Sequence, residues 1–165
     1  MSGNRDELLA RRRALQLRQQ RDAQRNRIAR ELAALDQAGA SYELIWPDAV
    51  NAIWIGQRFP QMGSRIDWSA VPDVSVQRWH DGQDREQLCR QLLRHYAAEE
   101  TAPILAVWGD AETPALCMTA AECARHCAIL LDADFELWLS STSAAWLMEW
   151  QAEGVVYAGR LPPQS

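Results

Sequence analysis

Lysine is absent from this chain, because all 17 of its positively charged residues are arginines. A Schiff-base lysine, a lysine general base and the lysine-containing phosphate loop each need an amine, so these three chemistries are excluded. The chain also lacks an apolar run of the ~20 residues that a bilayer-spanning helix requires. Its first residues are polar and lack the apolar stretch of a signal peptide. We therefore expect a cytoplasmic protein with reduced cysteines.

Recognised catalytic and metal-binding motifs are missing as well. The chain has no G-x-S-x-G motif and no C-x-x-C pair. Cys117, Cys123, His126 and Cys127 cluster in sequence, but their spacing is not that of a structural zinc site. We interpret them as buried small residues and expect neither a metal nor a cofactor. A small enzyme that uses a Cys/His pair or paired carboxylates stays open as an alternative.

Charge and aromatic residues are unevenly distributed along the 165 residues. Residues 1–36 contain nine arginines and five acidic residues, a net charge of +4, and no aromatic residue. The remainder contains eight arginines and 17 acidic residues, a net charge of −9, and all 13 aromatic residues. This asymmetry predicts an N-terminal helix over residues 1–38 and a globular domain over residues 39–165.

The first segment has the pattern of one long helix. Asn4 is a suitable N-cap and Gly39 a suitable stop. Its apolar residues fall into two groups separated by a polar stretch. The first group is Leu8, Leu9, Leu15 and Leu17, and the second group is Ile28, Leu32 and Leu35. The second group predicts that the end of the helix docks on the globular domain. Pairing with itself or with a partner, and nucleic-acid binding through arginines, are the alternatives, and the acidic body argues against nucleic acid.

Short strands and helices alternate after residue 40, which is typical of an α+β fold. We predict strands at residues 42–46, 73–79, 103–108, 115–118 and 134–140, helices at 83–99 and 119–131, and a loop at 59–73. Residues 49–59 fit a helix or a strand. Alternation over residues 144–157 favours a terminal β-hairpin. The sequence therefore predicts a mixed or antiparallel sheet packed against two helices, with the long helix at the N-terminus and the hairpin at the end.

Acidic residues and tryptophans of the last third of the chain are the candidate partner-binding residues. Eight tryptophans are enough to form much of a core of this size. Trp79, Trp138 and one of Trp146 or Trp150 alternate with polar residues and are expected to reach the surface. The candidate contact residues are Asp110, Asp132, Asp134, Glu136, Trp138, Trp146, Glu149 and Glu153. If they share one face, that face suits a basic protein partner.

Three stretches near the C-terminus carry a resemblance to a known group of proteins. Residues 134–140 (DFELWLS), 145–150 (AWLMEW) and 154–160 (GVVYAGR) resemble the C-terminal part of small immunity proteins that neutralise bacterial contact-dependent-inhibition and related polymorphic toxins. The resemblance covers about 30 of the 165 residues. It implies a cytosolic, non-enzymatic, acidic protein that binds and blocks a toxin, often a basic nuclease.

Taken together, these features predict a binding protein with a cognate toxin domain as its partner and no membrane or nucleic-acid partner. The first alternative is a dimeric secretion chaperone or adaptor assembled through the N-terminal helix. The second is the small enzyme mentioned above.

Overall fold

A seven-stranded antiparallel sheet forms the centre of the molecule. The computed structural model describes residues 2–99, 101–133, 136–143 and 145–162. The strand order is β1-β6-β5-β7-β8-β9-β4, so β1 and β4 are the edges. The strands are β1 (Glu43–Ile45), β4 (Ser75–Arg78), β5 (Ile104–Trp108), β6 (Ala115–Met118), β7 (Leu137–Ser141), β8 (Trp146–Gln151) and β9 (Val155–Arg160). The predicted α+β class is confirmed, and of the two predicted sheet types the antiparallel one is observed.

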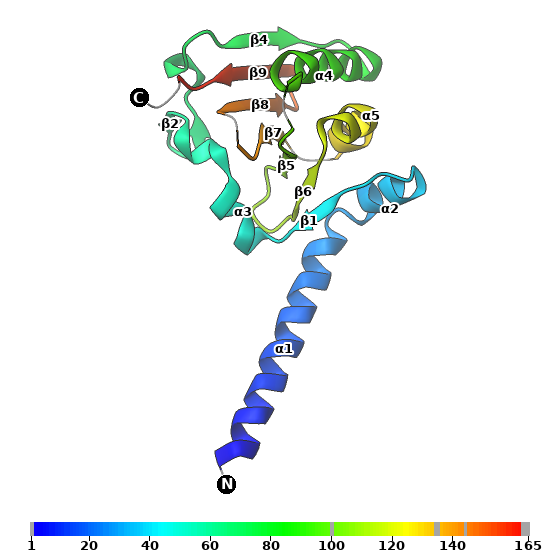
Figure 1. Cartoon of the computed structure of the whole chain (residues 1–165), viewed down its shortest axis with the longest axis vertical. Helices are drawn as coiled ribbons and strands as arrows, with labels where there is room; N and C mark the ends of the chain where they lie inside the picture. The colour runs from blue at the N-terminus through cyan, green and yellow to red at the C-terminus, as the bar shows by residue number, and fades with distance from the viewer. Residues whose placement is uncertain (1, 100, 134–135, 144, 163–165) are drawn as a thin grey trace.

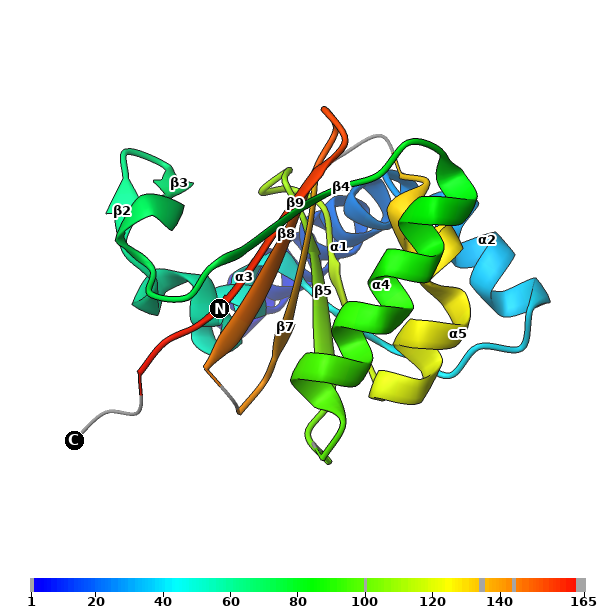
Figure 2. The same ribbon diagram turned by 90° about the horizontal axis from the view of Figure 1, so that it is seen from above.

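Both faces of this sheet are covered. Helices α4 (Gly82–Ala97) and α5 (Ala120–Leu131) lie against one face, with α2 (Ala29–Gln37) beside α5. Figure 2 shows α3 (Pro47–Ile53) and the small β2/β3 hairpin (Gln61–Met62 and Arg65–Ile66) on the opposite side. Central strands are therefore buried on both sides, and five of the six residues of β8 are buried.

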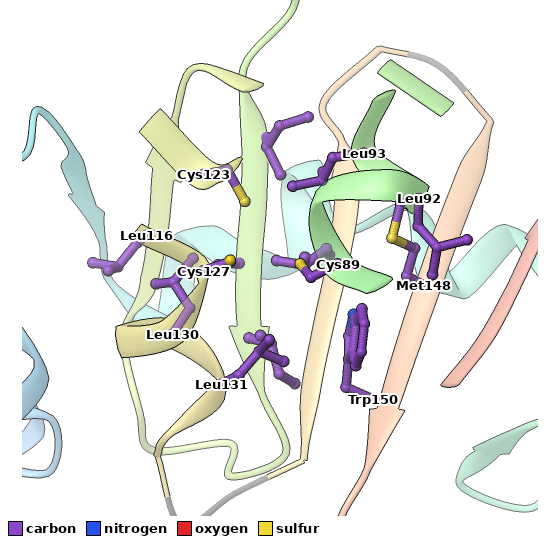
Figure 3. Close-up of a cluster of buried hydrophobic side chains, with 14 of the residues drawn as sticks. Cys89, Leu92, Leu93, Leu116, Cys123, Cys127, Leu130, Leu131, Met148 and Trp150 are labelled. Atoms are coloured by element: carbon purple, nitrogen blue, oxygen red, sulfur yellow. The ribbon is translucent and has the colours of Figure 1, made fainter. Parts of the chain in front are cut away.

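The main core lies between the sheet and the helices α4 and α5. Figure 3 shows Cys89 of α4 on the side of that helix that faces Cys123 and Cys127 of α5, and Leu92 beside Met148 of β8. Apolar residues at helical spacing produce these faces. Thr119 caps α5 by accepting a hydrogen bond from the Glu122 backbone N–H at 3.1 Å. This side of the sheet is thus a closed, close-packed layer.

The opposite face holds a second, smaller apolar cluster. Phe59 and Trp68 pack there against Leu147 of β8, and the Trp68 ring stacks on Tyr157 with centroids 5.8 Å apart. The segments that cover this face differ in part from expectation. Residues 49–59 take the helical alternative, as the end of α3 and the 3-10 helix η1 (Ile55–Arg58). The predicted loop at 59–73 is wrong in part, because it contains the β2/β3 hairpin and the 3-10 helix η2 (Trp68–Ala70).

The predicted long N-terminal helix is divided into two. Helix α1 (Ser2–Asn26) ends before Ile28, whose backbone leaves the helical region at φ −122° and ψ 27°, and α2 follows. Ile28, Leu32 and Leu35 are at most 3% exposed in the main core, so the predicted docking is confirmed. Gly39 ends the segment at φ +70°. Asn4 is not the N-cap, because the helix already begins at Ser2.

Helix α1 projects away from the body (Figure 1). Its base is held where it meets the sheet, since the Arg21 guanidinium lies 5.1 Å from the Trp46 ring centroid and Arg27 forms an ion pair with Asp110. Along the described residues, no helix combines the length and the apolarity needed to cross a membrane.

Candidate functional site: a cavity walled by tryptophans

A cavity of about 410 Å³ lies on the sheet face opposite α4 and α5. The rings of Trp54 and Trp138 form two of its walls, and amide and hydroxyl side chains of η1 and the β2/β3 hairpin complete it. Trp108 also borders the cavity, but its indole lies on the opposite side of the sheet and donates to the Leu130 carbonyl at 3.2 Å. Its lining residues are Trp54, Gln57, Gln61, Ser64, Ile66, Val107, Trp108, Gly109 and Trp138. Pockets that bind organic ligands or anchor side chains are of this size, mostly apolar with a few polar groups.

Two aromatic rings set the shape of this cavity. Trp54 follows the last turn of α3, and Trp138 extends from β7 on the side opposite Leu137 and Leu139. Their ring centroids are 6.2 Å apart with an interplanar angle of 73°, an edge-to-face contact. Val107 is the cross-strand neighbour of Trp138 on β5. Strand alternation therefore presents Trp138 to the cavity while its neighbours enter the main core.

Glycines allow both rings to approach the backbone. A Cβ atom added at Gly109 would lie 3.2 Å from the Trp138 ring and 3.4 Å from the Glu136 Cβ, which is closer than the ring can accept without moving. A Cβ atom added at Gly56 would lie 2.2 Å from the Trp54 ring. A side chain at either position would therefore displace one wall of the cavity.

The polar groups of the cavity lie on its exposed side. Gln57, Gln61 and Ser64 are exposed. Gln61 donates from Nε2 to the carbonyl of Gly56 at 2.8 Å, which ties the hairpin to η1. Within the described part of the chain, the indole N–H of Trp138 is buried without an acceptor. An unpaired buried donor costs about 1–3 kcal/mol.

Two carboxylates lie next to this cavity. Glu136 is half-buried beside Gly109, whose N–H donates to the Glu136 carbonyl at 2.8 Å. Asp110 follows Gly109 and forms an ion pair with Arg27. Burial by itself would raise the pKa of Asp110, but hydrogen bonds from the Glu112 N–H, Arg27 and Thr113 outweigh it and hold this pKa below its usual value. Asp110 is thus ionised and paired within the molecule, and Glu136 is the carboxylate next to Trp138.

The other predicted contact residues lie elsewhere. Asp132 is exposed, 3.8 Å from Arg30, and Glu153 is exposed in the turn between β8 and β9. Asp134 lies outside the described residues. The expectation of one shared face is wrong for Trp146, which is fully buried on the helix side, and for Glu149, which is 3% exposed on the other side.

Glu149 serves the packing of the second cluster. Its carboxylate accepts hydrogen bonds from the indole N–H of Trp68 and from Gln151 Nε2, the latter at 3.3 Å. Trp146 packs in the main core against Tyr96, with ring centroids 5.9 Å apart. Trp79 and Trp138 are half-buried as expected, whereas neither Trp146 nor Trp150 reaches the surface. The reason is the cover on both faces of the sheet, which hides residues on either side of a strand.

Several lining residues were missed by the sequence reasoning. Trp54 belongs to the segment that fitted a helix or a strand, so its direction was open. Gln57, Gln61 and Ser64 carry no motif. Gly109 directly follows the predicted strand at 103–108, and this position was the available signal of a close approach.

Cys89, Cys123 and Cys127 form a buried cluster between α4 and α5, whereas Cys117 lies on β6 and is only half-buried, so the predicted burial is wrong for Cys117. Cys89, Cys123 and Cys127 have no exposed surface and are free thiols. Burial raises the pKa of Cys123 well above its ordinary value. His126 is 7% exposed and lies 3.5 Å from Glu122. Over the described residues, no group of three or more His, Cys, Asp or Glu side chains is arranged to hold a metal ion. Cys123, His126 and Cys127 fit the packing role predicted for them.

No protein-family model matches the chain, and no curated protein is significantly similar to it.

The arrangement suits recognition of an inserted side chain. Two tryptophan rings offer π faces and edges to an aromatic, aliphatic or guanidinium group. Glu136, two residues before Trp138 and with its Cβ atom near Gly109, brings a negatively charged residue to the border of the cavity, and Gln57, Gln61 and Ser64 of the lining offer hydrogen bonds. An arginine or another long basic side chain matches all three features at once.

Proposed function

We propose that this protein is a cytoplasmic binding protein of the immunity type, which neutralises a cognate bacterial toxin domain by holding a basic side chain of that domain in the cavity. The observation that carries the proposal is the edge-to-face pair of Trp54 and Trp138 in a 410 Å³ cavity beside Glu136. Aromatic pockets at the centre of interfaces contribute most of the binding energy in many complexes.

The charge of the body supports a basic partner. Residues 37–165 have a net charge of −9, which speeds the approach of a cationic domain. A partner of this kind includes nucleases, whose surfaces must attract phosphate. The C-terminal resemblance to immunity proteins points to the same class of partner, and the proposal extends it to a particular cavity.

The test uses the product of the gene immediately upstream, which an immunity protein is expected to bind one to one. Isothermal titration calorimetry compares the wild type with Trp138→Ala and Glu136→Arg. We expect Trp138→Ala to weaken binding by about 30-fold or more, because loss of a central aromatic anchor costs about 2 kcal/mol or more. Glu136→Arg is expected to weaken binding and to lower the association rate at low salt.

Glu153→Arg is the matched control for charge. Glu153 is exposed in the β8–β9 turn and does not line the cavity, so its reversal changes the net charge equally and should leave affinity within about threefold. Thermal melts confirm that each variant is folded. Equal losses for Glu153→Arg and Glu136→Arg would contradict a role for the cavity, and a neighbouring gene product that does not bind would overturn the proposed function.

Helix α1 favours a second candidate, an adaptor that dimerises through this helix. Leu8, Leu9, Leu15 and Leu17 are 43–59% exposed on a helix that projects from the body (Figure 1). Leu8 and Leu15 are seven residues apart and share a face, whereas Leu9 and Leu17 lie on other sides. A single partner helix covers one side of α1, so Leu8 and Leu15 are the pair that α1 of a second copy would contact first.

Light scattering after size-exclusion chromatography distinguishes the two candidates. The adaptor predicts a dimer that becomes a monomer when the four leucines are replaced by glutamine, with the melting temperature of the body unchanged because α1 contributes no residue to its core. A wild-type monomer at concentrations of 100 µM or above would remove this candidate.

A further inference from the structure

Strand β4 is an edge of the sheet, and its outward backbone groups can be assigned from its register with β9. The Trp79 N–H donates to the Gly154 carbonyl at 3.2 Å, next to the pairs Arg78 with Val155 and Gln77 with Val156. In an antiparallel ladder, hydrogen-bonded pairs alternate with non-bonded ones. Gln77 and Ser75 therefore bond to β9, and the N–H and C=O groups of Val76 and Arg78 point outward.

A groove of about 580 Å³ runs beside this edge, between β4 and α4. Ser75 and Gln77 of β4 line one side, and Gln91, Arg94, His95 and Tyr96 of α4 line the other. A free strand edge next to a helix-flanked groove is the arrangement by which domains add an extended peptide to a sheet. The edge then supplies main-chain hydrogen bonds, and the groove takes alternate side chains.

Charge along this edge indicates which peptide it fits. Arg78 and Arg94 are exposed, and within the described residues neither has a carboxylate within ion-pair distance. His95 lies next to Arg94, and Asp73 is the acidic residue at the groove. The edge is thus locally basic on a body of net charge −9. Val76, 53% exposed, lies on the same face of the strand as Arg78, opposite the groove that contains Arg94, and offers an apolar contact there.

We propose that β4 accepts an extended acidic segment of a protein partner as an eighth strand, with carboxylates on one face of that segment near Arg94 in the groove and carboxylates on its other face near Arg78. Pairing of β4 with β4 of a second copy would bring the arginines of both copies together, and this repulsion favours an acidic peptide as the occupant. This surface lies on a different side of the sheet from the tryptophan cavity and does not depend on the function proposed above.

Two synthetic probes test the proposal with the full chain. One is a capped heptapeptide of glutamates, which presents carboxylates on both faces of an added strand, and the other is the same peptide with arginine in place of glutamate. Nitrogen-15 NMR titration should show shifts at Val76 and Arg78 and slower exchange of their amide protons with the glutamate peptide. We expect the arginine peptide to bind at least tenfold more weakly. Arg94→Glu should reduce this preference at least tenfold.

Val76→Pro tests the main-chain bonds. Proline removes the outward N–H without removing a bond to β9, so the fold is kept while the added strand loses a donor. We expect Val76→Pro to bind the glutamate peptide at least tenfold more weakly than the wild type. Val76→Thr retains the N–H, so its affinity for this peptide should stay within threefold of the wild-type affinity. Trp138→Ala should bind the peptide as the wild type does, which separates this surface from the cavity.

Three results would overturn the proposal. They are absence of binding by the wild type, equal binding by Val76→Pro in a folded protein, and a wild-type dimer that Val76→Pro dissociates. The last result would identify a second copy as the occupant of the edge.

Discussion

Replacing Trp146 by alanine is expected to lower the free energy of unfolding by about 3–5 kcal/mol, because the change leaves a large cavity in the main core. Trp146 has no exposed surface and packs against Tyr96 of α4. Domains of this size are stable by about 5–15 kcal/mol, so the loss is a large share of the total. The variant should have a much lower urea midpoint.

Circular dichroism during urea unfolding measures this effect without relying on tryptophan fluorescence. Trp79→Ala is the matched control, since Trp79 is half-buried at the border of the same core and contacts Trp150 with ring centroids 5.4 Å apart. Trp79→Ala should lower the free energy of unfolding by at most half as much as Trp146→Ala does. A loss below about 1.5 kcal/mol for Trp146→Ala would mean that this side chain is not packed as described.

Replacing Glu149 by arginine is expected to abolish cooperative folding. The carboxylate is 3% exposed and accepts hydrogen bonds from Trp68 and Gln151. An arginine there would place a charged donor against these two donors, next to Trp138 and Tyr157 on the neighbouring strands. Burying an unpaired charge costs more than about 4 kcal/mol in such a site.

Thermal and urea unfolding of Glu149→Arg and Glu136→Arg make the comparison direct, because the same charge change is made at a buried and at a half-buried position. We expect Glu136→Arg to unfold within a few degrees of the wild type. A cooperative Glu149→Arg transition near the wild-type midpoint would contradict the burial of this carboxylate. Loss of partner binding in Glu149→Arg is expected from unfolding and says nothing about an interface.

Local patterns gave most of the secondary structure. The capping of α5 by Thr119, the stop at Gly39 and the β8/β9 hairpin follow from residue types within a few positions of one another. The docking of Ile28, Leu32 and Leu35 follows from their helical spacing. The break between α1 and α2 was missed, because Asn26 is a weak helix former between good ones and the turn is needed only for docking on the body.

The cavity was predictable only in part. Alternation along β7 placed Trp138 on the side opposite Leu137 and Leu139, and this was correct. The remaining walls come from residues 54–66 and 107–109, which no local pattern connects with Trp138. Packing of α3 and the β2/β3 hairpin on this face brings them together.

The sequence by itself determined the composition of the two regions, the absence of amine chemistry, the α+β class and the side of its strand on which each residue lies. Tertiary structure alone decided which of those sides are exposed. In β8, Trp146 and Glu149 point to opposite faces, yet both are buried, since α4 covers one face and η1 and η2 cover the other. Direction along a strand is a local property of the backbone, whereas burial depends on segments distant in sequence that pack against it.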